Sequence, residues 1–153
     1  MPIPPKRIRD PQHLRQPHLD IGRDRSRTPM PWDGSPHAGF SSAEPWLPLN
    51  PDWAARNVAA QEDDPGSMLT LYRRLLALRR SRPAPAVGTF RLLDAPDGVL
   101  AYAREHEGQT LRVLLNLTAK ARTVPWRGEP LLSTLHGDPE AGMLYPDEGL
   151  ILA

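Results

Sequence analysis

Proline is distributed unevenly along this chain, and its placement limits the possible folds more than any other feature. Eleven of the nineteen prolines lie in residues 1–51. Proline fixes φ, removes a backbone donor and drives the preceding residue away from the helical conformation. The same residues lack the apolar spacing of a helix and hold few alternating apolar runs. We therefore expect this third of the chain to be extended and loop-like, which is unusual inside a small compact domain.

Large aromatic residues in residues 1–64, which we call the arm, argue against simple disorder. Disordered segments are usually poor in such residues, because their side chains would remain in water. Fully burying one aromatic side chain contributes about 1.5–3 kcal/mol. We therefore expect the arm to dock onto a surface that another part of a protein supplies. Its large aromatic residues are Trp32, Phe40, Trp46 and Trp53.

A helix is expected to follow the arm. Asp64-Pro65 has the pattern of an N-cap followed by proline at the first helical position. Residues 67–80 place most of their apolar side chains on one face, which predicts an amphipathic helix of about four turns. Pro83 and Pro85 are expected to end it. The residues of the apolar face are Met68, Leu71, Tyr72, Leu75, Leu76 and Leu78.

After Gly88 the apolar period changes to that of β-strands. Alternating runs separated by the turn sequences Pro96-Asp97-Gly98 and Glu107-Gly108-Gln109 predict antiparallel strands. A spacing of about ten residues is typical of a small sandwich or half-barrel of Greek-key type. The predicted fold class is therefore mainly β with one long helix. The expected strands are 89–93, 99–104, 111–117 and 122–126, with weaker candidates at 131–135 and 150–152.

Length and composition exclude several classes of protein. The 153 residues cannot hold a complete (β/α)₈ barrel, which needs roughly 250. The absence of cysteine excludes disulfides, thiol catalysis and cysteine-ligated zinc. A net charge of +1 gives no general attraction to nucleic acid or to anionic membranes. No apolar run of about 18 residues is present, so we expect a soluble cytoplasmic protein with no membrane partner.

The sequence holds no complete catalytic or metal-binding motif. None of the five histidines is paired at i, i+4, no serine lies in a Gly-x-Ser-x-Gly context, and no glycine loop suits a phosphate. The basic cluster in residues 6–27 lacks the interleaved aromatics of a single-strand nucleic-acid site. Asn116-Leu117-Thr118 fits a glycosylation acceptor, but its position predicts a strand end instead. We interpret the acidic clusters as solvated caps and turns: Glu62-Asp63-Asp64, Asp94 with Asp97, and Asp147 with Glu148. We therefore expect no catalytic residue, no metal and no cofactor in this chain.

An ordered set of motifs nevertheless resembles one enzyme family. Gly22-Arg23-Asp24 is followed by Arg27-Thr28-Pro29-Met30-Pro31-Trp32-Asp33. The later motifs, in order, are Ala38-Gly39-Phe40-Ser41, Pro45-Trp46-Leu47-Pro48-Leu49, Asn57-Val58, Gln61 and residues 67–80. Together they resemble the C-terminal third of bacterial α-glucosidases of glycoside hydrolase family 13, the α-amylase family, and most closely the oligo-1,6-glucosidase subgroup. The resemblance runs from near Ile3 to near Leu152.

The resemblance implies a division of the chain. Residues 1–64 would be the end of the catalytic domain and line the mouth of the active site. Residues 65–82 would be the last helix of the barrel, and residues 86–153 would be the small antiparallel β-sandwich called domain C. Arg27 would bond the non-reducing-end hydroxyls of glucose and pair with an aspartate from elsewhere in the barrel. Arg27 is the one candidate substrate-binding residue, and this role would require a complete barrel. Its alternative role is to anchor the loop.

Two departures from the family pattern bear on function. Pro31 stands where the family usually has glutamine, which removes a backbone donor and restricts Met30. The family's nucleophile, acid/base glutamate and transition-state-stabilising aspartate lie upstream and have no counterpart here. Because the double displacement needs two carboxyl groups, the resemblance implies no turnover by this chain alone.

Three functions follow from these observations. The leading one is the C-terminal part of an α-glucosidase, which acts on an α-glucoside or oligosaccharide only when a barrel is supplied. The second is a subunit that completes a separately encoded N-terminal barrel fragment. The third is a stand-alone β domain that binds carbohydrate or another protein. Linkage preference is not encoded here, because the family's discriminating residues lie upstream.

Overall fold

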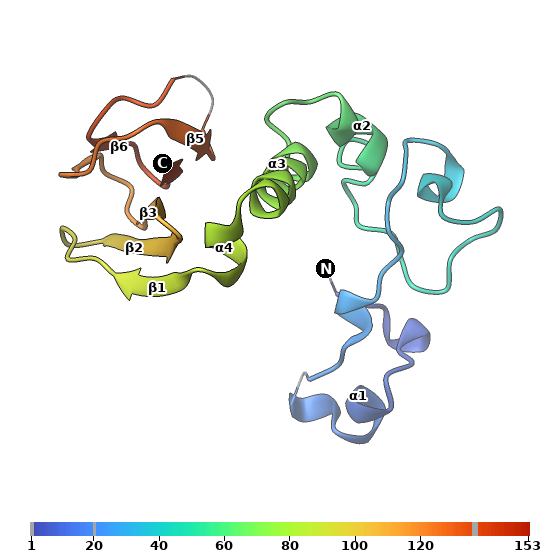
Figure 1. The fold of residues 1–153 in the computed structure, drawn as a ribbon. Coiled ribbons are helices and arrows are strands. Elements are labelled where there is room, and N and C mark those ends of the chain that lie inside the picture. Colours follow the sequence, from blue (N-terminus) through green and yellow to red (C-terminus); the bar gives the residue numbers. More distant parts are fainter. Residues whose placement is uncertain (1, 20, 136–137) are drawn as a thin grey trace. The chain divides into compact units, whose positions relative to one another are not determined.

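The computed structural model describes residues 2–19, 21–135 and 138–153 (Figure 1). The chain divides into two compact units, Met1–Leu69 and Thr70–Ala153. We refer to them as unit 1 and unit 2.

Short helical turns joined by irregular chain make up unit 1. Proline occupies the first position in four of these turns. The expectation of an extended, loop-like arm is therefore wrong in part. The fixed φ of proline suits the first turn of a helix, and its missing N–H is not needed there. The helices are η1 (Pro5–Arg7), α1 (Pro11–Arg15), η2 (Pro17–Leu19), η3 (Asp24–Ser26), η4 (Pro36–Gly39) and α2 (Val58–Glu62), where η marks a 3₁₀ helix.

Unit 1 buries polar groups rather than an apolar core. Asn57 illustrates this, because its buried side chain caps α2 by accepting a hydrogen bond of 2.9 Å from the amide of Ala60. Hydrogen bonds, not apolar packing, thus define the structure of this unit. Among its described residues, the buried ones are Asp10, Asp24, Pro29, Ala38, Asn57 and Ser67.

The helix expected over residues 67–80 is α3, which spans Met68–Ser81. Asp64 does not cap it, because its Oδ1 accepts from the amide of Gly66 at 2.8 Å and closes a turn before the helix. The side chain of Gln61 instead accepts from the amide of Leu69 at 3.2 Å. Pro83 follows the end of α3 and also begins a further short helix, α4 (Pro83–Val87).

Unit 2 is built on antiparallel strands in two sheets. The larger sheet has five strands in the order β1-β2-β3-β7-β5, and the smaller pairs β4 with β6. All the predicted strands are present, although the run 122–126 shortens to β4, since Pro125 has no N–H to donate. The two residues of β6 are too short to show a period and were not predicted. The strands are β1 (Thr89–Leu92), β2 (Val99–His106), β3 (Gln109–Asn116), β4 (Arg122–Thr123), β5 (Pro130–Ser133), β6 (Met143–Leu144) and β7 (Gly149–Leu152).

Both predicted turns form between strands. Glu107 and Gly108 connect β2 to β3 as a two-residue loop with φ of 45° and 79°. Two consecutive positive φ values are typical of a type I′ hairpin turn, whose twist matches that of the strands. At the preceding turn, the amide of Val99 donates to the Pro96 carbonyl at 3.0 Å, and Gly98 has a φ of 80°.

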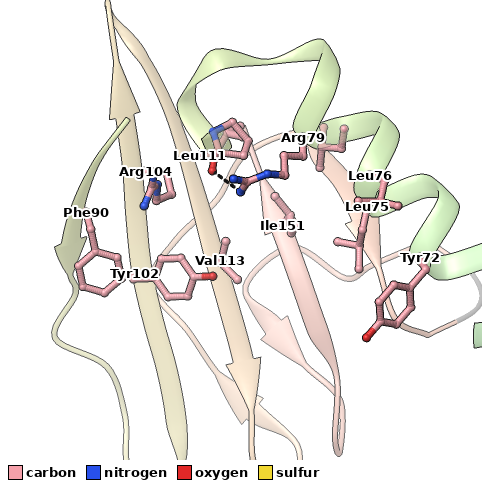
Figure 2. A pocket seen from close by; sticks show the side chains of 12 residues that line it. Tyr72, Leu75, Leu76, Arg79, Phe90, Tyr102, Arg104, Leu111, Val113 and Ile151 are labelled. Atoms are coloured by element: carbon pink, nitrogen blue, oxygen red, sulfur yellow. Dashed lines mark hydrogen bonds between the residues drawn. The ribbon is translucent and has the colours of Figure 1, made fainter. Parts of the chain in front are cut away.

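The larger sheet has two different apolar faces. One face packs against residues of the smaller sheet and forms the core of unit 2. The other face looks toward α3 across a groove (Figure 2). This agrees with the predicted antiparallel β unit, while α1, α2 and α4 add to the single helix that was expected. The buried core residues are Ala101, Leu114, Val124, Leu144, Leu150 and Leu152.

Candidate functional site

The Gly22-Arg23-Asp24 motif forms a clasp with Asp10. The guanidinium of Arg23 donates from Nε and Nη2 to the two oxygens of the Asp10 carboxylate, at 2.7 and 3.0 Å. The backbone amides of Arg23 and Gln12 donate to the same carboxylate at 2.8 and 2.9 Å. These bonds hold the pKa of the buried Asp10 well below its ordinary value, and those from the Arg23 side chain have the largest effect. The same pair raises the pKa of Arg23.

Asp24 adds two further hydrogen bonds to this clasp. Its buried carboxylate accepts from the amides of Arg9 and Asp10, at 2.8 and 3.0 Å. The two carboxylates therefore lock residues 9–12 to residues 22–24. The amides of Ser26 and Arg27 then bond back to the carbonyls of Arg23 and Asp24, both at 3.0 Å, and close η3.

Arg27, the predicted substrate-binding residue, directly follows η3. Its backbone is fixed by its bond to the Asp24 carbonyl, and the residue is exposed. Within residues 2–19, 21–135 and 138–153, no hydrogen bond or ion pair engages its guanidinium. A guanidinium fork of this kind can bind a carboxylate or sugar oxygens. The clasp thus positions the backbone of Arg27, while the described part of unit 1 gives its side chain no partner.

A strained turn follows the Arg-Thr-Pro-Met motif. His37, Ala38 and Gly39 have consecutive φ values of 56°, 58° and 63°. The left-handed conformation costs roughly 1–2 kcal/mol for each residue other than glycine. A Cβ at Gly39 would lie 2.6 Å from Oδ2 of Asp33, so only glycine allows this approach. Hydrogen bonds from Ser35 to the Asp33 carboxylate stabilise the turn and lower the pKa of Asp33.

Three of the four large aromatic residues of the arm remain about half exposed. Trp46 has Arg9 over its ring, with the guanidinium carbon 3.9 Å from the ring centre. Its Nε1 donates to the Arg7 carbonyl at 3.1 Å. Even so, Trp46 is 53% exposed, Trp32 51% and Phe40 49%. This exposure suits side chains that dock onto another surface. The existence of that other surface stays a prediction.

One of the acidic residues interpreted as solvated is in fact buried. Glu148 accepts from the Ser133 hydroxyl at 2.7 Å and from the Tyr145 amide at 2.8 Å. Its neighbour Asp147 is exposed at a turn with a φ of 57°. Burial follows from the position of Glu148 beside β7, where its carboxylate ties β5 to the turn after β6. The interpretation of Glu148 as a solvated turn residue is therefore wrong.

Asn116 lies at the end of β3, as predicted, and its side chain is fully engaged. Its amide nitrogen donates to the carbonyls of Tyr145 and Lys120 at 2.7 and 2.8 Å. Its oxygen accepts from the amide and hydroxyl of Thr118 at 3.1 and 2.8 Å. Because the side chain is buried and bonded on both sides, it cannot carry a glycan in the folded chain.

Across the described residues, no group of three or more histidine or acidic side chains is arranged to bind a metal ion. In the same part of the chain, no helix is both long and apolar enough to cross a bilayer. The buried carboxylates of Asp10, Asp24 and Glu148 all accept hydrogen bonds from protein donors.

The clasp and Arg27 lie within a segment that matches a known family. The model of the alpha-amylase catalytic domain matches residues 2–88, which is more than half of the chain. The chain belongs to the alpha-amylase family. The match also includes the strained turn, α3 and α4, so the resemblance inferred from the motifs is confirmed.

Relatives in the alpha-amylase family give the match more detail. "Probable alpha-glucosidase" of Rhizobium meliloti (strain 1021) is 43% identical over 102 residues, which are 67% of this chain and 18% of that protein. "Probable oligo-1,6-glucosidase 3" of Bacillus subtilis (strain 168) is 38% identical over 73% of this chain and 20% of its own length. The crystal structure of trehalulose synthase MutB from Pseudomonas mesoacidophila MX-45 aligns with a TM-score of 0.76 and 35% identity, over 86% of this chain and 26% of that one. The chain therefore spans between 18% and 26% of the length of these relatives.

No sequence pattern predicted the clasp. Asp10-Pro11 carries the same N-cap pattern as Asp64-Pro65, and it is Asp10 that caps a helix begun by proline. Applying the pattern at both positions would have identified α1. The pairing with Arg23, 13 residues away, leaves no such local signal.

Proposed function

We propose that this chain supplies the C-terminal part of an α-glucosidase, an enzyme that hydrolyses terminal α-linked glucose. The observation that carries the proposal is the match of the catalytic-domain model to residues 2–88, together with 43% identity to a probable alpha-glucosidase. In this proposal residues 1–64 are the end of the catalytic domain, residues 65–82 the last barrel helix and residues 86–153 domain C. The two antiparallel sheets of unit 2 support the last assignment. The proposed setting is the cytoplasm, with which a cysteine-free chain is compatible.

Arg27 is proposed to bind glucose when the rest of the barrel is present. Its backbone is held by η3 and the clasp, whereas its guanidinium is exposed and has no partner in the described part of the chain. A positioned backbone with an unengaged fork suits a residue whose ligands come from elsewhere. Those ligands would be the sugar hydroxyls and a carboxylate of the upstream catalytic domain.

The chain alone is proposed to have no hydrolytic activity. A retaining glycosidase needs a nucleophilic carboxylate and an acid/base carboxyl about 5–5.5 Å apart. The buried carboxylates of Asp10, Asp24 and Glu148 instead accept hydrogen bonds that stabilise loops. Both catalytic groups would therefore come from the upstream domain.

The test is to fuse the full chain to the upstream portion of the Rhizobium meliloti relative, ending where the match begins. The fusion is expected to hydrolyse 4-nitrophenyl α-glucoside, and the chain alone is not. In the active fusion, Arg27→Lys keeps the charge but loses the fork, so kcat/KM should fall about tenfold to a hundredfold. Arg15→Lys, an exposed substitution on α1, is the matched control and should leave kcat/KM unchanged. A correctly folded but inactive fusion would contradict the proposal.

A second candidate function is carbohydrate binding without hydrolysis. The half-exposed rings of Trp32, Phe40 and Trp46 favour it, because aromatic faces can stack on sugar rings. Calorimetric titration of the isolated chain with maltose and isomaltose tests it. A flat titration with both sugars removes this candidate.

A further inference from the structure

The Asp10 carboxylate accepts more hydrogen bonds than a helix cap requires. Capping α1 takes one oxygen, which accepts from the Gln12 amide at 2.9 Å. Three further bonds join the same carboxylate to Arg23, one from its amide and two from its guanidinium, at 2.7 to 3.0 Å. The Asp10 side chain is fully buried, whereas that of Arg23 is 54% exposed. Asp10 is therefore the partner whose charge is removed from water.

This buried charge is an unusual feature of a unit with little apolar packing. Burying a carboxylate is costly unless it is paired and hydrogen-bonded. A well-packed apolar pair of similar volume often stabilises a protein as much as a buried ion pair does, or more. An apolar pair would not, however, supply the directed hydrogen bonds that fix residues 22–24 against α1. The geometry that Asp10 and Arg23 fix therefore explains their pairing better than stability alone.

Only the short helix η3 separates this pair from Arg27. The amide of Arg27 donates to the Asp24 carbonyl at 3.0 Å, and the Asp24 carboxylate accepts from the Asp10 amide, also at 3.0 Å. After Arg27, the buried Pro29 restricts Thr28 to extended conformations. The backbone of Arg27 is thus constrained on both sides, and Asp10 bonds to the residues that constrain the first side.

Gly22 allows the close approach that this geometry needs. A Cβ at this position would lie 2.8 Å from Nδ1 of His13 and 2.9 Å from its Cβ. A larger residue would therefore push α1 away from the segment that carries Arg23. The first residue of the Gly22-Arg23-Asp24 motif thus serves the same arrangement as the second and third.

We infer that Asp10 is a positioning residue for glucose binding by Arg27 and acts on it through Arg23 and η3. This role rests on the proposed function, which assigns glucose to Arg27 and gives Asp10 no part in substrate affinity. A displacement of about 1 Å at a group that binds substrate can cost about a hundredfold in rate. Asp10 therefore contributes to KM without touching the substrate.

A competing explanation is that Asp10 only withholds Arg23 from the carboxylate expected upstream. In Asp10→Asn the Arg23 guanidinium would be released four residues before Arg27, where it could compete for that carboxylate. If competition were the cause, the double variant Asp10→Asn/Arg23→Gln would recover the natural KM. The positioning role predicts that the double variant stays impaired, because the bonds that hold η3 against α1 are still missing.

The test measures kcat and KM of the fusion to the upstream portion of the Rhizobium meliloti relative, with 4-nitrophenyl α-glucoside as substrate. Asp10→Asn keeps the shape of the side chain and loses its charge, so KM should rise about tenfold while kcat changes less than about twofold. A smaller amount of folded enzyme would instead lower kcat and leave KM unchanged. Arg23→Lys keeps the charge but loses the bidentate fork, so its KM should rise by a smaller factor than in Asp10→Asn.

Two further variants separate positioning from a general loss of structure. In the Arg27→Lys background, D10N should raise KM less than about twofold, because the group that Asp10 positions is already altered. Glu44→Gln is the matched control, since Glu44 forms an ion pair with Arg7 in the same unit and, among the described residues, bonds to none of residues 22–27. This pair is exposed on the Glu44 side, so the same change from carboxylate to amide should leave KM within about twofold of the natural value.

Each outcome decides for or against the positioning role. A higher KM in D10N that vanishes in the R27K background and persists in the double variant with Arg23→Gln supports it. If the fusion is active, four results overturn the role and leave the proposed function standing: a KM in D10N equal to that of E44Q, an effect confined to kcat, an undiminished effect in the R27K background, or recovery in the double variant. A folded but inactive fusion overturns the proposed function and the positioning role with it.

Discussion

A single carboxylate, that of Asp10, receives four hydrogen bonds from Gln12 and Arg23. Because its pKa is lower in the folded chain, these bonds stabilise the fold above the ordinary carboxyl pKa of about 4. That stabilisation is lost as the pH falls below this value and through the folded pKa. Asp10 therefore makes unit 1 sensitive to acid.

Asp10→Asn tests this dependence. The amide cannot pair with the Arg23 guanidinium, so amide hydrogen exchange in residues 9–27 should be faster than in the natural chain at pH 7. The difference should shrink below about pH 4, where the natural carboxylate begins to be protonated. Asp63→Asn, at an exposed position after α2, is the control. Equal exchange protection of D10N and the natural chain at pH 7 would contradict the role of the clasp.

The Asn116 side chain has a comparable role in unit 2. Asn116→Ala leaves the carbonyls of Lys120 and Tyr145 and the amide of Thr118 without this partner. The free energy of unfolding of unit 2 should fall by about 1–3 kcal/mol, measured by urea denaturation. Lys120→Ala is the control, since only the backbone of Lys120 bonds to Asn116. If both variants unfold at the same urea concentration, the Asn116 network does not stabilise the fold.

At the scale of elements, the structure that sequence patterns predicted depends mainly on local contacts. The apolar period predicted α3 and the strands other than β6, and Glu107-Gly108 predicted the hairpin between β2 and β3. Sequence patterns did not predict contacts between residues that lie far apart in the sequence. The pairing of Asp10 with Arg23 and the burial of Glu148 depend on chain segments brought together by folding, and no local period encodes them.

The hairpin between β2 and β3 uses an unfavourable residue at one position. Glu107 has a φ of 45°, in a region that asparagine and glycine adopt at lower cost. Glu107→Asn should raise the free energy of unfolding of unit 2 by about 1 kcal/mol, seen as a higher thermal midpoint. Glu107→Gln retains the strain and should unfold like the natural chain. An equal thermal midpoint for E107N and E107Q would show that the turn carries no such strain.

At the scale of the whole molecule, the two units differ in what holds them together. Unit 2 has a core of large aliphatic side chains that includes Leu114, Leu144 and Leu150, each no more than 3% exposed. Among the described residues of unit 1, the buried apolar ones are only Pro29 and Ala38. Apolar burial is the dominant favourable contribution to folding, so the two units should differ strongly in stability. We therefore expect unit 1 to need a surface outside itself for its stability.

Limited proteolysis of the isolated chain tests this difference. Because loops without a core open readily, cleavage should concentrate in residues 1–69, while a fragment near residues 70–153 persists. The persistent fragment should show one cooperative thermal transition, and the first unit should add none. In the fusion to the upstream portion of the Rhizobium meliloti relative, residues 1–69 should become resistant, since docking supplies the apolar contacts that this unit lacks. Equal resistance of both units in the isolated chain, with a single sharp transition for all 153 residues, would show that unit 1 needs no external surface.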